Sequence, residues 1–258
     1  MVLRIVQKLK LIIKLIWYLF GPDAKNLGTP ISLISGITSA LCLKTEARHS
    51  LKFLLTLEKE LYSFTGQEAC RYGNGIHTKH RHTKYHNFFI KNLNDGESVL
   101  DIGCGNGTLA FDIAKNRPDV KIYAIDIIES NIEYAKKNYQ HKNLKFVVGD
   151  ALKDLPDEKF DCVILSNVLE HIEHRIQFLE GIKKSICPER ALIRVPLYER
   201  DWRVPLMDEL GLDYRLDSTH YIEYIYEDFV HEVNSAGLEI ISSEFRWGEV
   251  WSVCSIKG

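Results

Sequence analysis

The sequence lacks closely spaced cysteines. Its six cysteines form no C-x-x-C pair; they are Cys42, Cys70, Cys104, Cys162, Cys187 and Cys254. Zinc knuckles need ligands at short fixed spacings, and disulfide-stabilised domains are short and dense in cysteine. The spacing therefore argues against both kinds of fold. It also favours a reducing compartment, so we expect a cytoplasmic protein.

The sequence also lacks an excess of charge of one sign. The formal net charge of the 258 residues is -2 at pH 7, so no overall positive field draws the chain to nucleic acid. Internal repeats and low-complexity segments are not evident. The hydrophobic content of 45% and the charged content of 26% match an ordinary folded globular protein. Composition therefore predicts a globular protein with no nucleic-acid partner.

A long uninterrupted hydrophobic run is missing as well. Residues 1–20 are largely apolar but carry Arg4, Lys8, Lys10 and Lys14, with no acidic residue among them. A membrane-spanning helix needs about 20 apolar residues, and Lys14 interrupts the apolar core that a signal peptide requires. We therefore expect an amphipathic helix. It either lies on an anionic membrane surface, at the inner face of the membrane, or docks on its own domain or on a partner.

Helical patterns continue after this segment. Residues 26–43 are free of charge and rich in serine, threonine and glycine, which predicts a buried helix rather than a membrane span. Leucines at helical spacing predict a second helix over residues 45–64, and residues 79–93 predict a further one. Glycines within residues 66–75 mark a loop between them. Residues 1–70 are thus expected to form a helical N-terminal extension.

From residue 97 onward, short apolar runs alternate with helical segments of about ten to fifteen residues, which predicts right-handed βαβ units and a parallel sheet. The expected strands are SVLDI, KIYAID, LKFVVG, FDCVILS, ALIRVP, LEIISSEFRW and EVWSVCSIKG. The last two meet at Gly248 and are expected to form an antiparallel hairpin at the sheet edge. The predicted fold class is therefore α/β, with a Rossmann-like, mostly parallel seven-stranded sheet in a domain of residues 71–258.

A glycine-rich loop follows the first of these strands. Gly103, Gly105 and Gly107 have the spacing G-x-G-x-G, whereas an NAD-binding loop has G-x-G-x-x-G. Glycine has no Cβ, so the backbone can approach a ligand closely. Asp101 lies two residues before the first glycine, where its carboxylate would repel a pyrophosphate and attract a cation. The loop therefore favours a positively charged ligand over a dinucleotide.

Over about residues 70–258, the chain resembles the class I S-adenosylmethionine-dependent methyltransferases of the small-molecule type. The motif E/D-x-G-x-G-x-G runs from Asp101 to Gly107, Asp126 ends the second strand, Asp150 follows the third, and SNVLEHI follows the fourth. Each element lies at the carboxyl end of a strand, where open α/β sheets bind ligands. S-adenosylmethionine carries an ammonium and a sulfonium group and no phosphate, which agrees with a site for a cation.

The resemblance implies which residues bind the cofactor. Asp101 would bind the methionine ammonium, Asp126 would accept hydrogen bonds from both ribose hydroxyls, and Asp150 would accept one from the adenine amino group. The implied cofactor-binding residues are Asp101, Gly103, Gly105, Gly107, Asp126, Ile127, Asp150, Ala151 and Asn167. Two alternatives stay open, because Asp126 would also suit the ribose of NAD and Asp150 could cap the next helix.

Two histidines are candidates for a catalytic base. An alcohol or phenol acceptor must lose its proton during methyl transfer, and histidine suits that task near neutral pH. His171 follows the fourth strand, and His220 lies in the long segment after the fifth, where this family often carries substrate loops. The alternative for each is a helix cap or a hydrogen-bonded loop histidine. Aromatic residues between 202 and 224 would form either a lid over the site or ordinary core.

A second group of histidines precedes the glycine loop: His77, His80, His82 and His86. His82 and His86 have the i, i+4 spacing of two metal ligands on one helix face. Basic residues intervene, however, so no metal is expected there. We favour a segment that covers the cofactor, or a site for an anionic methyl acceptor formed by Lys79, Arg81 and His80. An exposed basic helix start is the alternative.

These patterns together predict an enzyme that transfers a methyl group from S-adenosylmethionine to a small-molecule, glycan or lipid-linked acceptor, at oxygen. A nicotinamide-dependent oxidoreductase and a non-catalytic methyltransferase-like scaffold are the alternatives. A nucleic-acid methyltransferase is not expected, because the N/D-P-P-Y type of sequence is absent after the fourth strand. The sequence carries no indication of an oligomeric state.

Overall fold

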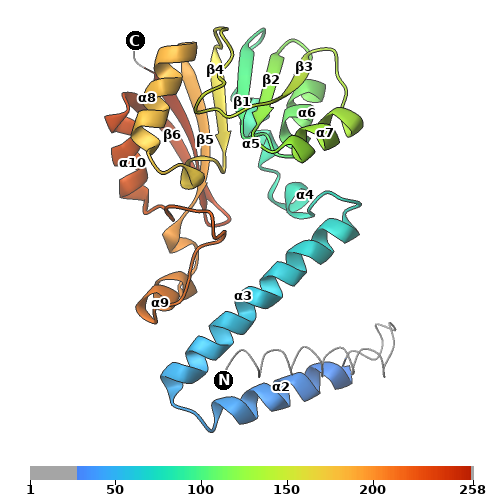
Figure 1. Cartoon of the computed structure of the whole chain (residues 1–258), viewed down its shortest axis with the longest axis vertical. Coiled ribbons are helices and arrows are strands. Elements are labelled where there is room, and N and C mark those ends of the chain that lie inside the picture. Colours follow the sequence, from blue (N-terminus) through green and yellow to red (C-terminus); the bar gives the residue numbers. More distant parts are fainter. Residues whose placement is uncertain (1–27, 257–258) are drawn as a thin grey trace. The chain divides into compact units, whose positions relative to one another are not determined.

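The computed structural model describes residues 28–256, so the amphipathic helix predicted for residues 1–20 lies outside the described residues. The chain divides into two compact units, Met1–Leu61 and Tyr62–Gly258. Helices make up the described part of the first unit, and the second unit contains the sheet (Figure 1).

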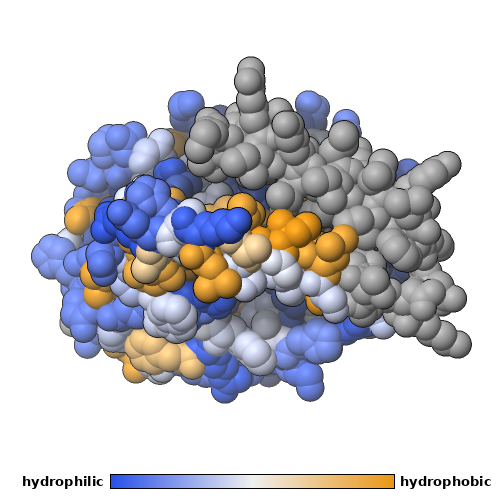
Figure 2. Space-filling model, turned by 90° about the horizontal axis from the view of Figure 1, so that it is seen from below, coloured by the Kyte–Doolittle hydropathy of each residue, from blue (hydrophilic) through white to orange (hydrophobic). Residues whose placement is uncertain are grey.

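In the first unit, α2 (Gly28–Cys42) confirms the helix expected at residues 26–43. The prediction that it is buried was wrong, because Ile31 is 59% exposed and Leu33 is 47% exposed. Hydrophobic residues are visible at the surface among polar ones (Figure 2). Within residues 28–256, no helix combines the length and the hydrophobicity that crossing a membrane would require.

The helices before the sheet differ from the sequence prediction at two points. The next helix, α3 (Ala47–Tyr72), continues through Gly66, because helix-forming residues flank this glycine and offset its cost of about 1 kcal/mol. The helix predicted for residues 79–93 is broken into α4 (Lys79–Thr83) and α5 (His86–Lys91). Lys84 lies between them with a φ of 52°, which ends the first helical turn.

The predicted sheet is confirmed in number and direction of strands. In the part of the chain that the structure describes, seven strands lie in the order β3-β2-β1-β4-β5-β7-β6. The strands are β1 (Ser98–Ile102), β2 (Lys121–Asp126), β3 (Leu144–Val148), β4 (Cys162–Ser166), β5 (Arg190–Pro196), β6 (Leu238–Arg246) and β7 (Glu249–Ile256). The first five pair in parallel, and β7 pairs antiparallel with both β5 and β6.

Helices cover both faces of this sheet (Figure 1). On one face, α8 (Arg175–Ile186) and α10 (Tyr226–Ser235) pack on the strands; on the other, α5, α6 (Thr108–Asn116) and α7 (Glu129–Asn138) do so. The central strands are therefore buried on both sides, which explains why SVLDI and CVILS read as continuous apolar runs rather than as alternating ones.

The strand order indicates which edge of the sheet binds a ligand. β1 is followed in the chain by β2, on one side, whereas β4 is followed by β5, on the other. The connections after β1 and β4 therefore leave the sheet in opposite directions. Ligands of open α/β sheets bind at such a switch point, beyond the carboxyl ends of the strands. The glycine loop after β1 and the segment after β4 meet there.

Candidate functional site

The loop between β1 and α6 contains three residues in the left-handed region. Gly103, Gly105 and Gly107 have φ values of 68°, 55° and 80°, a conformation that residues with a Cβ rarely adopt. A Cβ on Gly103 would lie 2.7 Å from Cγ2 of Val168, and one on Gly107 would lie 2.6 Å from Cε1 of Phe146. The close packing of the loop against β3 and the segment after β4 therefore requires glycine.

A cavity of about 200 Å³ lies beside this loop. Four of the residues predicted to bind the cofactor line it, namely Asp101, Gly103, Gly105 and Asn167. Asn167 directly follows β4 and has a φ of 58°. The structure thus brings the ends of β1 and β4 together around one cavity.

Two acceptor oxygens of this cavity have no donor. The side chain of Asp101 is buried, with 1% of the residue exposed. Its Oδ2 and Oδ1 of Asn167 have no hydrogen-bond partner among the described residues. Burial, and then the like charge of Asp126, raises the pKa of Asp101 to about 8. A ligand that donates hydrogen bonds and carries positive charge would satisfy both oxygens and stabilise the Asp101 carboxylate.

Asp126, at the end of β2, holds the glycine loop in place. Its Oδ2 accepts a hydrogen bond from the backbone N–H of Gly105 at 2.8 Å, and its Oδ1 accepts one from that of Ile128 at 2.9 Å. Nδ2 of Asn131 donates a third at 3.2 Å. These bonds fix the loop to the neighbouring strand. Ile127 is 65% exposed beside it, and the ribose contact of Asp126 stays a prediction.

Asp150 organises the turn that follows β3. Its Oδ1 accepts a hydrogen bond from the backbone N–H of Leu152 at 2.9 Å, and its Oδ2 lies 3.0 Å from Nζ of Lys153. The bond from Leu152 and then the one from Lys153 lower the pKa of Asp150. Ala151 packs against the core. The side chain of Asp150 thus caps a turn, not the helix that the alternative interpretation expected, and its contact with adenine stays a prediction.

A chain of imidazole rings reaches the cavity from α4 and α5. Nδ1 of His86 lies 2.7 Å from Oδ2 of Asp112, and Nε2 of His86 lies 3.0 Å from Nδ1 of His80. Burial, and then the neighbouring His86, lowers the pKa of His80 to about 3. His80 and Lys79 both line the cavity. A neutral His80 can donate to His86, which in turn donates to Asp112.

Arg194, on β5, also lines the cavity and has no signal in the local sequence. Its guanidinium donates to both carboxylate oxygens of Glu249 at 2.6 Å and to Oγ of Ser166 at 3.2 Å. It also lies 3.9 Å from the ring centroid of Tyr85. Glu249 is a neighbour because β7 pairs with β5, so only the long-range strand order could have revealed this pair.

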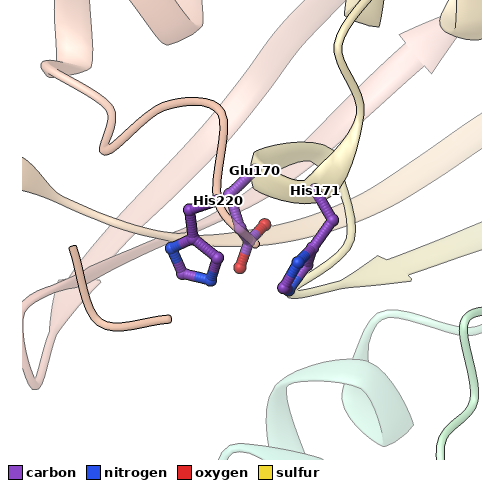
Figure 3. Close-up of side chains that lie close together, drawn as sticks. All are labelled: Glu170, His171 and His220. Atoms are coloured by element: carbon purple, nitrogen blue, oxygen red, sulfur yellow. The ribbon is translucent and has the colours of Figure 1, made fainter. Parts of the chain in front are cut away.

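A second group of side chains follows the same strand, β4. The short helix η2 (Leu169–His171) carries Glu170 and His171, and His220 comes from the segment before α10 (Figure 3). The rings of His171 and His220 are in contact, with centroids 4.5 Å apart and an interplanar angle of 85°. The two predicted catalytic candidates therefore lie together although 49 positions separate them in the sequence. Glu170, which lies between them in space, is a residue that the sequence analysis missed.

The aromatic residues after β5 differ in their exposure. Trp202 is 72% exposed and Tyr221 is 60% exposed, so both are free to contact a ligand. Tyr224 is fully buried, and its hydroxyl donates to Glu232 at 2.8 Å. Tyr224 is therefore part of the core, and a lid formed by the exposed aromatic residues stays a prediction.

The part of the chain that contains β1 to β5 and the glycine loop matches a known protein family. Residues 93–202 match the family model described as "Methyltransferase domain". This region is a class I S-adenosylmethionine-dependent methyltransferase domain. The family assignment indicates S-adenosylmethionine as the cofactor. The ligand of the glycine loop is therefore the positively charged nucleoside and not a dinucleotide. The unpartnered oxygens of Asp101 and Asn167 fit the ammonium group of that cofactor.

The methyltransferase domain has relatives with different named activities. It is 35% identical over 125 residues to a ribosomal protein L11 methyltransferase of Thermotoga neapolitana, covering 47% of this chain and 44% of that one. It is 33% identical over 97 residues to a ubiquinone biosynthesis O-methyltransferase of Rickettsia akari, covering 37% and 38%. The chain thus spans less than half the length of these curated relatives, which limits the likeness to the domain.

Solved structures agree with the fold. The magnesium protoporphyrin IX methyltransferase of Synechocystis PCC 6803, with bound S-adenosylhomocysteine, superposes with a TM-score of 0.58 at 18% identity. The match covers 78% of this chain and 99% of that one. At this identity the likeness establishes the Rossmann-like methyltransferase fold.

Proposed function

We propose that the chain transfers the methyl group of S-adenosylmethionine to an acceptor oxygen. In this reaction the acceptor oxygen forms a bond to the methyl carbon, the carbon–sulfur bond breaks, and S-adenosylhomocysteine leaves as a neutral thioether. The leaving group needs no proton. The work of the protein is therefore to align donor and acceptor, which can contribute about 7–11 kcal/mol, and to help the acceptor hydroxyl lose its proton.

The observation that carries this proposal is the pair of unpartnered oxygens beside the glycine loop. Oδ2 of Asp101 and Oδ1 of Asn167 are buried, and both residues line the cavity together with the glycine loop. An ammonium group would donate hydrogen bonds to both and would neutralise Asp101. We assign the methionine end of the cofactor to this cavity and, by the family resemblance, the ribose to Asp126 and the adenine to Asp150.

We assign the acceptor to a position beside His171 and His220. Nδ1 of His171 lies 2.8 Å from Oγ1 of Thr219, and Nδ1 of His220 lies 2.8 Å from Oε1 of Glu223. Since Nδ1 of each ring is engaged, Nε2 is the atom left to act on an acceptor. The segment that carries His171 also lines the cofactor cavity through Ser166 and Asn167, so donor and acceptor sites would share the end of β4.

We further propose that the acceptor is a small molecule, a glycan or a lipid-linked compound, and that residues 1–20 hold the chain on an anionic membrane surface. The basic amphipathic pattern of residues 1–20 supports the second point, as do the exposed apolar residues of α2. A liposome-flotation assay tests it. Anionic vesicles should carry the full chain but not a chain lacking residues 1–22, and equal flotation of the two would contradict it.

The proposed reaction is tested with methyl-labelled S-adenosylmethionine. Purified protein is incubated with fractionated lipid, glycan and small-molecule extracts, and label transferred to each fraction is counted. Asp101→Asn should abolish transfer, whereas Asp157→Asn, at an exposed position, should leave it unchanged. If S-adenosylhomocysteine bound tightly and no fraction accepted label, the result would contradict the proposed reaction and favour a non-catalytic methyltransferase-like scaffold.

A further inference from the structure

The group formed by Glu170, His171 and His220 has the composition of a metal site (Figure 3). One possible ligand atom from each residue lies within 4.8 Å of the others. Two residues come from the turn after β4, and the third comes from the segment that precedes α10. The fold, rather than a local motif, thus brings two imidazole nitrogens and a carboxylate to one point.

The burial of Glu170 is a second, independent observation that favours a positive charge at this point. Its residue is 0% exposed, and neither carboxylate oxygen has a hydrogen-bond partner among residues 28–256. A buried carboxylate without partners is costly, and such groups are normally paired with a cation or coordinated to a metal. The guanidinium of Arg194 is near enough to attract the carboxylate but makes no hydrogen bond to it, because Glu249 and Ser166 accept the hydrogen bonds of Arg194.

The two imidazoles are held in the way that metal ligands usually are. A ligating histidine commonly donates its other ring N–H to a carboxylate or another oxygen, which fixes the ring and its tautomer. Nδ1 of His220 lies 2.8 Å from Glu223 and Nδ1 of His171 lies 2.8 Å from Thr219. Glu223 is itself held by Arg200 at 2.6 Å. Nε2 of each ring is therefore left as a lone-pair donor.

We infer that Glu170, His171 and His220 form a binding site for a divalent transition-metal ion. Two nitrogen ligands and one oxygen ligand suit Zn²⁺, Mn²⁺ or Fe²⁺, whereas Mg²⁺ and Ca²⁺ prefer oxygen ligands throughout. Three protein ligands leave at least one position open. This departs from the sequence analysis, which expected no metal and considered only His82 and His86 as a ligand pair.

The open position indicates the role of the ion. An acceptor hydroxyl that binds there would be placed next to the cavity assigned to the methyl donor, and the ion would lower its pKa, as it does for bound water. The two rings would then act as ligands rather than as free bases. This role rests on the proposed methyl transfer, whereas the ion site itself rests on the geometry of the three side chains.

Calorimetry on the full chain tests the site. Protein stripped with a chelator is titrated with ZnCl₂ and, separately, with MnCl₂, and with S-adenosylhomocysteine as a check that the cofactor site is intact. We expect one ion to bind per chain, and at least a tenfold weaker affinity in each of the variants Glu170→Gln, His171→Ala and His220→Gln, on the order of what the loss of a metal-site contact costs. His174→Ala, an exposed neighbour, is the matched control and should bind as the unaltered protein does.

The outcomes separate the two proposals. Stripped protein that binds S-adenosylhomocysteine but neither ion overturns the metal site and leaves the methyltransferase proposal intact. Ion binding that survives all three substitutions also overturns it, because the ion then lies elsewhere. Ion binding at the three residues without any affinity for S-adenosylhomocysteine supports the site and contradicts the proposed function. Circular dichroism of each variant checks that it is folded.

Discussion

Asp101 and Glu170 are the two most fully buried acidic residues at the ligand-binding edge of the sheet. Each is at most 1% exposed, each has at least one oxygen without a partner among the described residues, and burial raises the pKa of each to about 8. Their surroundings differ. Asp101 lies among glycines, whose backbone admits an organic ligand, whereas Glu170 lies between two imidazoles. Under the two proposals, the same degree of burial of a carboxyl group would serve an ammonium group at Asp101 and a metal ion at Glu170.

The largest expected effect separates the two acids by affinity for the cofactor product. Asp101→Ala should weaken the binding of S-adenosylhomocysteine about 100-fold, because a charge-assisted hydrogen bond is worth about 1.5–3 kcal/mol. Glu170→Ala should change it by less than about threefold. Isothermal titration calorimetry at pH 8 measures both. Similar losses in the two variants would mean that the acids serve one site.

The same binding should depend on pH through Asp101. The ammonium favours the ionised carboxylate, whose pKa in the unliganded protein is about 8. Affinity for S-adenosylhomocysteine should therefore rise by up to about tenfold per pH unit between pH 6 and 8. Asp101→Asn should flatten this dependence, and Glu170→Gln should keep it. If the affinity of the unaltered chain did not depend on pH, the ionised Asp101 would not be the group that contacts the ammonium.

A smaller effect is expected from a residue that acts through His171. Thr219→Val removes the hydroxyl that lies 2.8 Å from Nδ1 of His171 and should weaken ion binding about tenfold, since contacts behind metal ligands typically contribute 10- to 100-fold. Thr219→Ser, which keeps the hydroxyl, should restore the affinity. Equal affinities in the Val and Ser variants would show that the hydroxyl does not orient the ring.

The smallest effect is on stability. A carboxyl whose pKa is higher in the folded than in the unfolded chain stabilises the fold fully below pH about 4 and loses that contribution as the pH rises toward about 8. Asp101→Asn and Glu170→Gln remove this loss. Each should raise the free energy of unfolding at pH 8.5 by about 1 kcal/mol or more relative to the unaltered protein. Urea unfolding at pH 5 and 8.5 measures it, with Asp157→Asn as a control that should show no such trend.

The sequence allowed most of the sheet and half of the candidate site to be predicted, because both depend on local pattern. The central strands are apolar runs, and the glycine loop with Asp101 carries its chemistry within seven residues. His171 and His220 could be proposed because each follows a predicted strand of one sheet edge. Their contact confirms that topology, and their catalytic roles stay predictions.

What the sequence could not reveal depends on packing between distant segments. Glu170, read locally, is an ordinary polar residue at the start of a helix, and it becomes buried because the segment before α10 covers it. The backbone N–H of Tyr221 in that segment donates to the carbonyl of Glu170 at 2.7 Å. Arg194 likewise gains its partner Glu249 only from the antiparallel insertion of β7. The break between α4 and α5 at Lys84 was missed because a lysine carries no turn signal.

The position of β7 determines when the sheet can be completed as the chain leaves the ribosome. Because β7 lies between β5 and β6, a nascent chain that has emerged only as far as β6 cannot add that strand to the sheet. Until residues 249–256 emerge, β5 presents an open edge and the guanidinium of Arg194 lacks its carboxylate. The surroundings of Arg194 at the switch point can therefore be completed only after residues 249–256 have left the ribosome, and ribosome-bound chains stalled before Glu249 should need a chaperone to shield that edge.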